Sequence, residues 1–172
     1  NPRVRVAASV ALGRMNNAAA AEELVVMALA PESKAAPKDE NADQVSKFTS
    51  DKVDPNNPLV DIELDISEFK SLTLTIESLD WDTGDHAAWV NPVIILKNGK
   101  EIDLTKMKWQ EAKGAWGKTL VNKDCLGNAL ENLKGETLKG IGTHATSNIV
   151  YNIPKGATTF KAQGTITKGA DN

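Results

Sequence analysis

The sequence predicts a mainly β protein, an antiparallel β-sandwich that is preceded by a short α-helical hairpin. Two changes along the chain predict this order. Apolar residues recur at helical spacing up to residue 32, whereas after residue 58 they alternate with polar residues at every second position. Between the two, proline and charged residues are frequent, as in linkers. We therefore expect a helical hairpin over 1–32, a linker over 33–58 and a β-sandwich over 59–172.

The first expected helix lies in residues 1–12, where Val6 and Val10 recur about one turn apart. Asn16 begins a polar turn that can cap a second helix, and Pro31 ends that helix. Residues 1–12 resemble one HEAT-type repeat, and a generic helical hairpin is the alternative. Two short helices cannot bury both apolar faces against each other alone, so we expect them to stack on further helices or on a neighbouring domain.

The expected linker over 33–58 contains few large apolar residues. Val45 and Phe48 are two of them, and they could dock this stretch onto a domain surface. The alternative is a mobile tether between the hairpin and the sandwich.

At least six short strands are expected after residue 58. Alternation of apolar and polar residues predicts half-buried strands, and Asn98-Gly99 predicts a tight hairpin between the third and the fourth. A turn at Pro154-Lys155-Gly156 separates the last two. The strands cover residues 60–66, 72–76, 90–97, 101–104, 148–150 and 158–163. Many short strands without a convincing helix indicate an antiparallel sandwich that is large enough to bury its own core.

The composition excludes several classes of partner. The chain has 172 residues with 20 basic and 23 acidic side chains, which gives a formal net charge of −3. It therefore lacks the basic footprint that nucleic-acid binding requires. It also has no apolar run near the roughly 18 to 20 residues that cross a bilayer. We expect neither a nucleic-acid partner nor a membrane span.

No residue pattern predicts catalysis. A nucleophilic site would need an activated Ser or Cys beside a base, and neither His86 nor His144 stands in a recognisable nucleophile motif. Cys125 has no second cysteine to pair with, and the two histidines beside it would leave a zinc site short of ligands. No carboxylate pair stands out for glycoside hydrolysis. For His144 a structural role and a ligand contact both stay open.

One acidic stretch resembles a calcium loop. Asp80, Asp82 and Asp85 follow one another at short spacing, and Ca²⁺ prefers six to eight oxygen ligands. The loop is not an EF-hand, because the twelfth position is Asn91 rather than Glu. We expect either one structural calcium ion here or a solvated turn between strands.

The tryptophans are the most informative residues for binding. An indole offers a flat face on which the C–H-rich face of a sugar ring can stack, together with one N–H donor. Trp89 begins an expected strand and is expected in the core. Trp116 lies in the glycine-flanked loop of residues 113–117, without apolar periodicity around it, and it is the best candidate for an exposed platform.

At this point the residues carry a family resemblance. Residues 140–151, GIGTHATSNIVY, resemble a sequence block of the NPCBM family, the carbohydrate-binding modules that are appended to bacterial glycoside hydrolases and other secreted proteins. Asp80 and Asp82 also stand where the family has an acidic turn before a long strand. The resemblance covers 59–163. It implies a galactose-binding-domain-like jelly roll without catalytic residues.

We therefore expect a noncatalytic carbohydrate-binding module within a larger bacterial protein that is secreted, periplasmic or on the cell surface. Its partners would be a glycan or polysaccharide and other domains of the same polypeptide. The expected binding residues are Trp116, Trp81, His144, Thr143 and Asn122. The alternative is a structural or protein-docking sandwich that positions a neighbouring enzyme or haem domain and binds no sugar.

Overall fold

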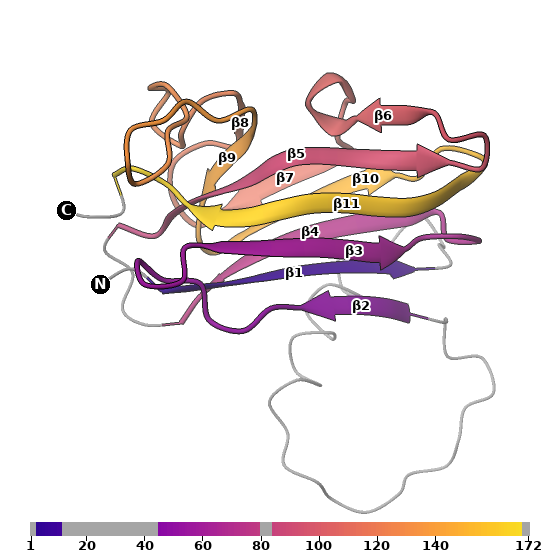
Figure 1. Ribbon diagram of the computed structural model, residues 1–172, viewed down its shortest axis with the longest axis horizontal. Helices are drawn as coiled ribbons and strands as arrows, with labels where there is room; N and C mark the ends of the chain where they lie inside the picture. The colour runs from indigo at the N-terminus through magenta and orange to yellow at the C-terminus, as the bar shows by residue number, and fades with distance from the viewer. Residues whose placement is uncertain (1–2, 12–44, 80–83, 170–172) are drawn as a thin grey trace, which may run out of the picture.

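The computed structural model describes residues 3–11, 45–79 and 84–169, which form two antiparallel β-sheets (Figure 1). One sheet has the strand order β2 (Val45–Thr49), β1 (Val4–Ala11), β4 (Ser71–Ser78), β10 (Ser147–Asn152), β7 (Glu111–Gly114). The other has the order β3 (Leu59–Asp65), β11 (Ala157–Ile166), β5 (His86–Leu96), β9 (Gly140–His144), β8 (Leu120–Val121). The short strand β6 (Glu101–Asp103) also pairs with β5 and leads into a 3₁₀ turn, η1 (Leu104–Lys106).

The two sheets lie face to face and share one hydrophobic core. Alternate residues of the longer strands point into it, as a period of two requires. In β4 these are Leu72, Leu74 and Ile76, all fully buried, and in the facing sheet they include Trp89 and Phe160. Fully burying an aliphatic or aromatic side chain stabilises the fold by about 1.5–3 kcal/mol, so this shared core holds the two layers together.

The expected mainly β, antiparallel architecture is confirmed, and each of the six expected strands is present as β3, β4, β5, β6, β10 or β11. The hairpin at Asn98-Gly99 joins β5 to β6, and Gly99 has the positive φ of 78° that such a turn favours. Among the described residues, no helix is long and apolar enough to cross a lipid bilayer.

The first expected helix is wrong. Residues Val4–Ala11 form β1, which pairs with β4 along its whole length, from Val4 opposite Ser78 to Ala11 opposite Ser71. Val4, Val6 and Ala8 are fully buried on one face of this strand. The segment allows both readings, because Val6 and Val10 are one helical turn apart whereas Val4, Val6 and Ala8 alternate, and β-branched valine favours the strand. The second expected helix lies outside the described residues.

Part of the expected linker also belongs to the first sheet. Residues 45–49 form β2, which pairs antiparallel with β1, and Phe48 packs against the shared core. Of the two alternatives for this segment, docking therefore holds for the part that the structure describes.

A long loop covers the outer face of the second sheet and forms part of the pocket wall described below. Residues 122–139 connect β8 to β9 and fold back over β5, where Leu130 joins Ala88 and Val90 in a small separate apolar cluster. The loop approaches β9 so closely that a Cβ atom on Gly142 would lie 2.1 Å from the carbonyl oxygen of Lys123. Glycine at this position is therefore required for the contact.

Candidate functional site

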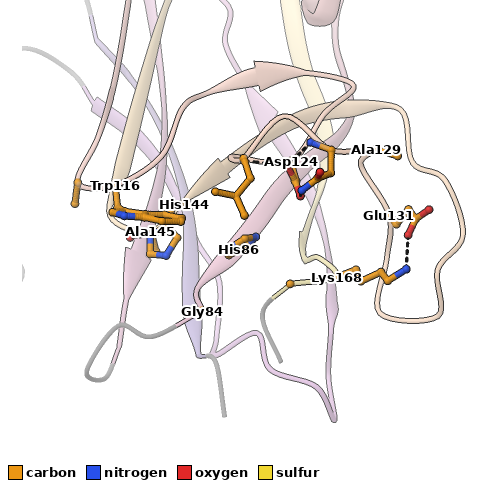
Figure 2. Close-up of a pocket in the computed structure, with 13 residues that line it drawn as sticks. Gly84, His86, Trp116, Asp124, Ala129, Glu131, His144, Ala145 and Lys168 are labelled. Carbon is orange, nitrogen blue, oxygen red and sulfur yellow. Dashed lines mark hydrogen bonds and ion pairs between the residues drawn. The ribbon is translucent and has the colours of Figure 1, made fainter. Parts of the chain in front are cut away.

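An open pocket of roughly 1100 Å³ lies at one end of the sandwich, where β5 begins and β9 ends (Figure 2). Its wall combines the start of β5, the end of β9, the loop after β7, the loop over the outer face and the last described residues. The lining residues are Gly84, His86, Ala115, Trp116, Asp124, Leu126, Asn128, Ala129, Glu131, His144, Ala145, Lys168 and Gly169. Sequence-distant segments thus build one concave site, as is typical of ligand pockets.

The floor of the pocket is a pair of histidines from neighbouring strands. His86 of β5 and His144 of β9 are direct cross-strand partners, and their side chains leave the outer face of the sheet. Their ring centroids lie 5.6 Å apart in an edge-to-face arrangement. Both residues are buried, at 5% and 6% exposure, because the surrounding loops cover most of each ring.

Each histidine has a different partner at Nδ1. The Nδ1 atom of His144 makes a short hydrogen bond with the carbonyl oxygen of Ala145. The Nδ1 atom of His86 lies 3.5 Å from the sulfur of Cys125. Burial raises the pKa of the Cys125 thiol to about 11, with Asp124 adding to the effect, so the sulfur stays protonated at neutral pH.

Burial also lowers the pKa of His86 below its ordinary value of 6.5, and the neighbouring His144 lowers it further. Asp124 and Asp85 act in the opposite direction but do not overcome these two causes. The His86 ring is therefore neutral at pH 7. At the floor of the pocket, His86 therefore has one N–H donor and one acceptor nitrogen and carries no charge.

Trp116 forms one side of the pocket. Its ring centroid lies 5.0 Å from that of His144 and 6.1 Å from that of His86, and the residue is 51% exposed (Figure 2). The backbone on either side is fixed, because the Ala115 amide donates to the Thr146 carbonyl oxygen and Gly117 packs against Cys125. The indole is thus held against the histidine pair while much of it stays open to solvent.

Asp124 shapes the loop opposite Trp116. Its Oδ1 atom accepts hydrogen bonds from the backbone amides of Leu126 and Asn128, and its Oδ2 atom accepts one from the Asn128 side chain. Burial alone would raise the pKa of this carboxyl, but these hydrogen bonds outweigh it and hold the pKa below its usual value. Both carboxylate oxygens therefore serve the structure of the loop.

An ion pair closes the far rim. The Lys168 Nζ atom lies 2.8 Å from a carboxylate oxygen of Glu131, and the Lys168 backbone amide donates to the Glu131 carbonyl oxygen (Figure 2). The same ion pair raises the pKa of Lys168. These contacts fix the C-terminal segment beside the loop, where Gly169 packs on the His86 ring.

Most of this pocket lies in a part of the chain that a family model recognises. Residues 100–171 match the NPCBM/NEW2 domain. This match confirms the resemblance that residues 140–151 indicated, and it includes every lining residue except Gly84 and His86. No curated protein and no solved structure matches the chain.

Within the NPCBM/NEW2 match, the structure brings two of the expected binding residues together, Trp116 and His144. Thr143 is buried and its hydroxyl lies 3.2 Å from that of Thr119, outside the pocket lining. Asn122 has a positive φ of 54°, and its side-chain oxygen accepts a hydrogen bond from the Gly140 amide, so it shapes the turn before the loop. Trp81 lies outside the described residues.

The calcium prediction involves a segment that is only partly described. Asp80 and Asp82 lie outside the described residues. Asp85 is fully buried; its Oδ2 atom accepts a hydrogen bond of 2.5 Å from the Ser78 hydroxyl, whereas Oδ1 has no hydrogen-bond partner among the residues that the structure describes. Among the described residues, no group of three or more histidine, cysteine or acidic side chains could hold a metal ion. An orphaned carboxylate oxygen fits a cation ligand, and the ion stays a prediction.

Sequence reasoning did not place His86, Cys125 or Lys168 in a binding site. The position of His86 depends on the register of β5 against β9, which no local pattern encodes. Cys125 reaches His86 only because the loop over the outer face folds back. The sequence signal that could have found His86 is its place at the start of a long strand, directly after the acidic turn.

Proposed function

We propose that this chain is a noncatalytic carbohydrate-binding module that holds the end of a glycan in the pocket beside Trp116. The observation that carries the proposal is a half-exposed indole packed on two histidine rings at the side of an open pocket. An indole face can stack on the C–H-rich side of a sugar ring, while nearby polar groups hydrogen-bond its hydroxyls. The match to the NPCBM/NEW2 domain supports the same function.

The acidic and thiol groups around the pocket support a noncatalytic role. A glycosidase needs one carboxyl to act as an acid and a second as a base or nucleophile. Here the Asp124 carboxylate accepts hydrogen bonds from its own loop, and the Glu131 carboxylate forms an ion pair with Lys168. The Cys125 thiol is buried, with a raised pKa that opposes formation of the nucleophilic thiolate.

The proposal extends to the context of the module. We infer a secreted bacterial polypeptide with further domains, and a galactose-binding-domain-like jelly roll as the detailed topology of the two sheets. We also infer that the module includes β1 and β2, because both strands pair in the first sheet and their neighbours fill the shared core. The sandwich would then begin before residue 59.

A glycan-array screen of the intact chain, with and without calcium, tests the proposal. We expect selective binding to one class of glycan, followed in titration by a change in tryptophan fluorescence. The affinity should be modest, with Kd in the range of roughly 10 μM to 1 mM, because a shallow site desolvates few sugar atoms. No binding across a broad array would contradict the proposal.

The alternative is a docking module that binds another domain and no sugar. One observation favours it: Leu126, 58% exposed, lines the same pocket as Trp116 and adds apolar surface to it. This role would be established if the chain bound no glycan on the array and if Leu126→Asp lost binding to a partner domain that the native chain binds. Glycan binding by the native chain would exclude docking as the main function.

A further inference from the structure

The two histidines at the floor of the pocket each have one ring nitrogen in contact with another protein group. Both residues line the pocket, and in both the Nδ1 atom already has a protein partner. Among the described residues, neither Nε2 atom has a hydrogen-bond partner. The hydrogen-bonding character of the floor therefore depends on which nitrogen of each ring carries the proton.

In His144 the partner fixes the proton on Nδ1. A backbone carbonyl oxygen can only accept hydrogen bonds, so the contact with Ala145 requires an N–H at Nδ1 of the histidine. In the neutral ring, Nε2 then carries a lone pair. His144 thus presents an acceptor to the pocket.

In His86 the partner is a thiol, which can donate through its S–H group or accept through its sulfur. Burial keeps the Cys125 thiol protonated, so its S–H group can donate to Nδ1 of His86 across 3.5 Å. When the thiol donates, the proton of the neutral His86 ring is at Nε2, which is then a donor, the opposite of Nε2 in its cross-strand neighbour.

We propose that His86 and His144 together recognise two adjacent hydroxyl groups of a sugar, with Nε2–H of His86 donating to one hydroxyl and Nε2 of His144 accepting from the other. This inference rests on the proposed function and names the chemical feature that the site selects. Trp116 lies beside both rings, so a sugar that stacks on the indole brings the edge carrying its hydroxyls toward the pair. Cys125 and the Ala145 carbonyl act as positioning groups, because they set the two tautomers.

The charges around the pair indicate that the sugar is neutral. Asp124 and Glu131 both line the pocket, and the cation on the rim, Lys168, is already paired with Glu131. These three side chains carry a net charge of −1, because Lys168 and Glu131 neutralise each other and Asp124 is left as an anion, so a carboxylate or sulfate on the ligand would meet a negative charge. The ligand class is therefore an uncharged glycan end with a vicinal diol.

The first test measures the tautomers without any ligand. Two-bond ¹H–¹⁵N correlation spectra of the ¹⁵N-labelled chain at neutral pH should show His86 protonated at Nε2 and His144 protonated at Nδ1. In Cys125→Ser the hydroxyl retains the donor and the tautomer of His86 should stay, whereas Cys125→Ala should let His86 populate both. The same tautomer at both histidines of the native chain would overturn the inference.

The second test uses a series of sugars. Methyl glycosides of common neutral hexoses identify the monosaccharide that binds best, and its monodeoxy analogues are then titrated. We expect two neighbouring deoxy positions to weaken binding roughly three- to tenfold each, the effect of losing one hydrogen bond, while the other positions have little effect. Sensitivity at positions that are not adjacent would overturn the inference.

Combining variants with analogues assigns each hydroxyl. His86→Ala should weaken binding of the parent glycoside but not of the analogue that lacks its partner hydroxyl, and His144→Ala should behave in the same way with the adjacent position. If an alanine variant does not fold, the glutamine variant replaces it. The NMR measurement of the tautomers and the titration of the deoxy analogues can both be made on the native chain. Binding with a non-adjacent pattern overturns this inference alone, whereas no binding to any glycoside overturns the proposed function with it.

Discussion

His86 and His144 lie directly opposite each other on β5 and β9, and their rings meet edge to face at a centroid distance of 5.6 Å. The cross-strand pairing brings together two residues that are 58 positions apart in the sequence. Three other parts of the pocket approach this pair: Trp116, Cys125 of the loop over the outer face, and Gly169. The sheet supplies the rigid floor and the loops supply the selective groups.

Replacement of Trp116 by alanine should abolish glycan binding with little loss of stability. The side chain is 51% exposed, so its removal should lower the free energy of unfolding by less than about 1 kcal/mol. Titration with the best glycan and a thermal melt check both expectations. Leu59→Ala is the matched control, because Leu59 is 44% exposed and lies in β3, outside the pocket. A large fall in the thermal midpoint for Trp116→Ala would place the indole in the core and remove it from the binding site.

Gly117 should be more sensitive to substitution than Gly99. Both have a positive φ, 68° and 78°, so alanine at either position carries a backbone cost of roughly 1–2 kcal/mol. At Gly99 a Cβ atom meets nothing within 4 Å, whereas at Gly117 it would lie 3.0 Å from both the Cβ and the carbonyl oxygen of Cys125. Urea denaturation should therefore show a larger loss for Gly117→Ala, which should also weaken glycan binding by displacing Trp116. Equal losses in the two variants would mean that the Cys125 contact is not tight.

The strands could be predicted from the sequence where the pattern is local. In β3 and β4 the alternation of apolar and polar residues has only one interpretation, and Asn98-Gly99 predicts the hairpin directly. The segment of β1 was predicted as a helix because Val6 and Val10 are one helical turn apart, although Val4, Val6 and Ala8 also alternate. The decision comes from β4, which lies about 70 residues away. Local spacing cannot report a distant partner.

In the candidate site, too, residues in a recognisable local pattern could be predicted, whereas residues that depend on distant contacts could not. Trp116 and His144 could be predicted because glycine-rich surroundings indicate a loop and a close backbone approach. His86 and Cys125 could not, because their contact depends on the fold of residues 122–139 over the sheet. Asn122 and Thr143 have the polar chemistry of binding residues, but their hydrogen bonds join parts of the protein to each other.

Cys125 should react slowly with thiol reagents in the folded protein. It is 2% exposed, and burial raises the pKa of its thiol to about 11, so both access and the thiolate fraction are low at about pH 8. A disulfide reagent such as DTNB, followed by absorbance, should report a rate at least a hundredfold below that of the same chain in denaturant. Because the chain has a single cysteine, the signal has one source. Equal rates in the two conditions would contradict the burial of this thiol and its contact with His86.

The lowered pKa of His86 predicts how stability depends on pH. In the unfolded chain this histidine has its ordinary pKa of 6.5, whereas in the folded protein burial, and then His144, lower the pKa against the opposing effects of Asp124 and Asp85. Above about pH 7 both states are neutral at His86 and the contribution does not change. Below about pH 6.5 the unfolded state binds the proton first, so the free energy of unfolding falls as the pH decreases toward the folded pKa.

The measurement is urea denaturation of the native chain and of His86→Gln between about pH 7.5 and pH 5, a window in which most carboxyl groups stay ionised. The native chain should lose more stability than the variant on acidification, with a difference in slope of at most about 1.4 kcal/mol per pH unit, the limit for one proton. The variant keeps every titratable group of the chain except His86, which makes it a matched control. Parallel pH dependences, or an NMR titration midpoint of His86 above 6.5, would show that the ring accepts a proton readily, and the neutral donor that it offers to the pocket would then be lost under mildly acidic conditions.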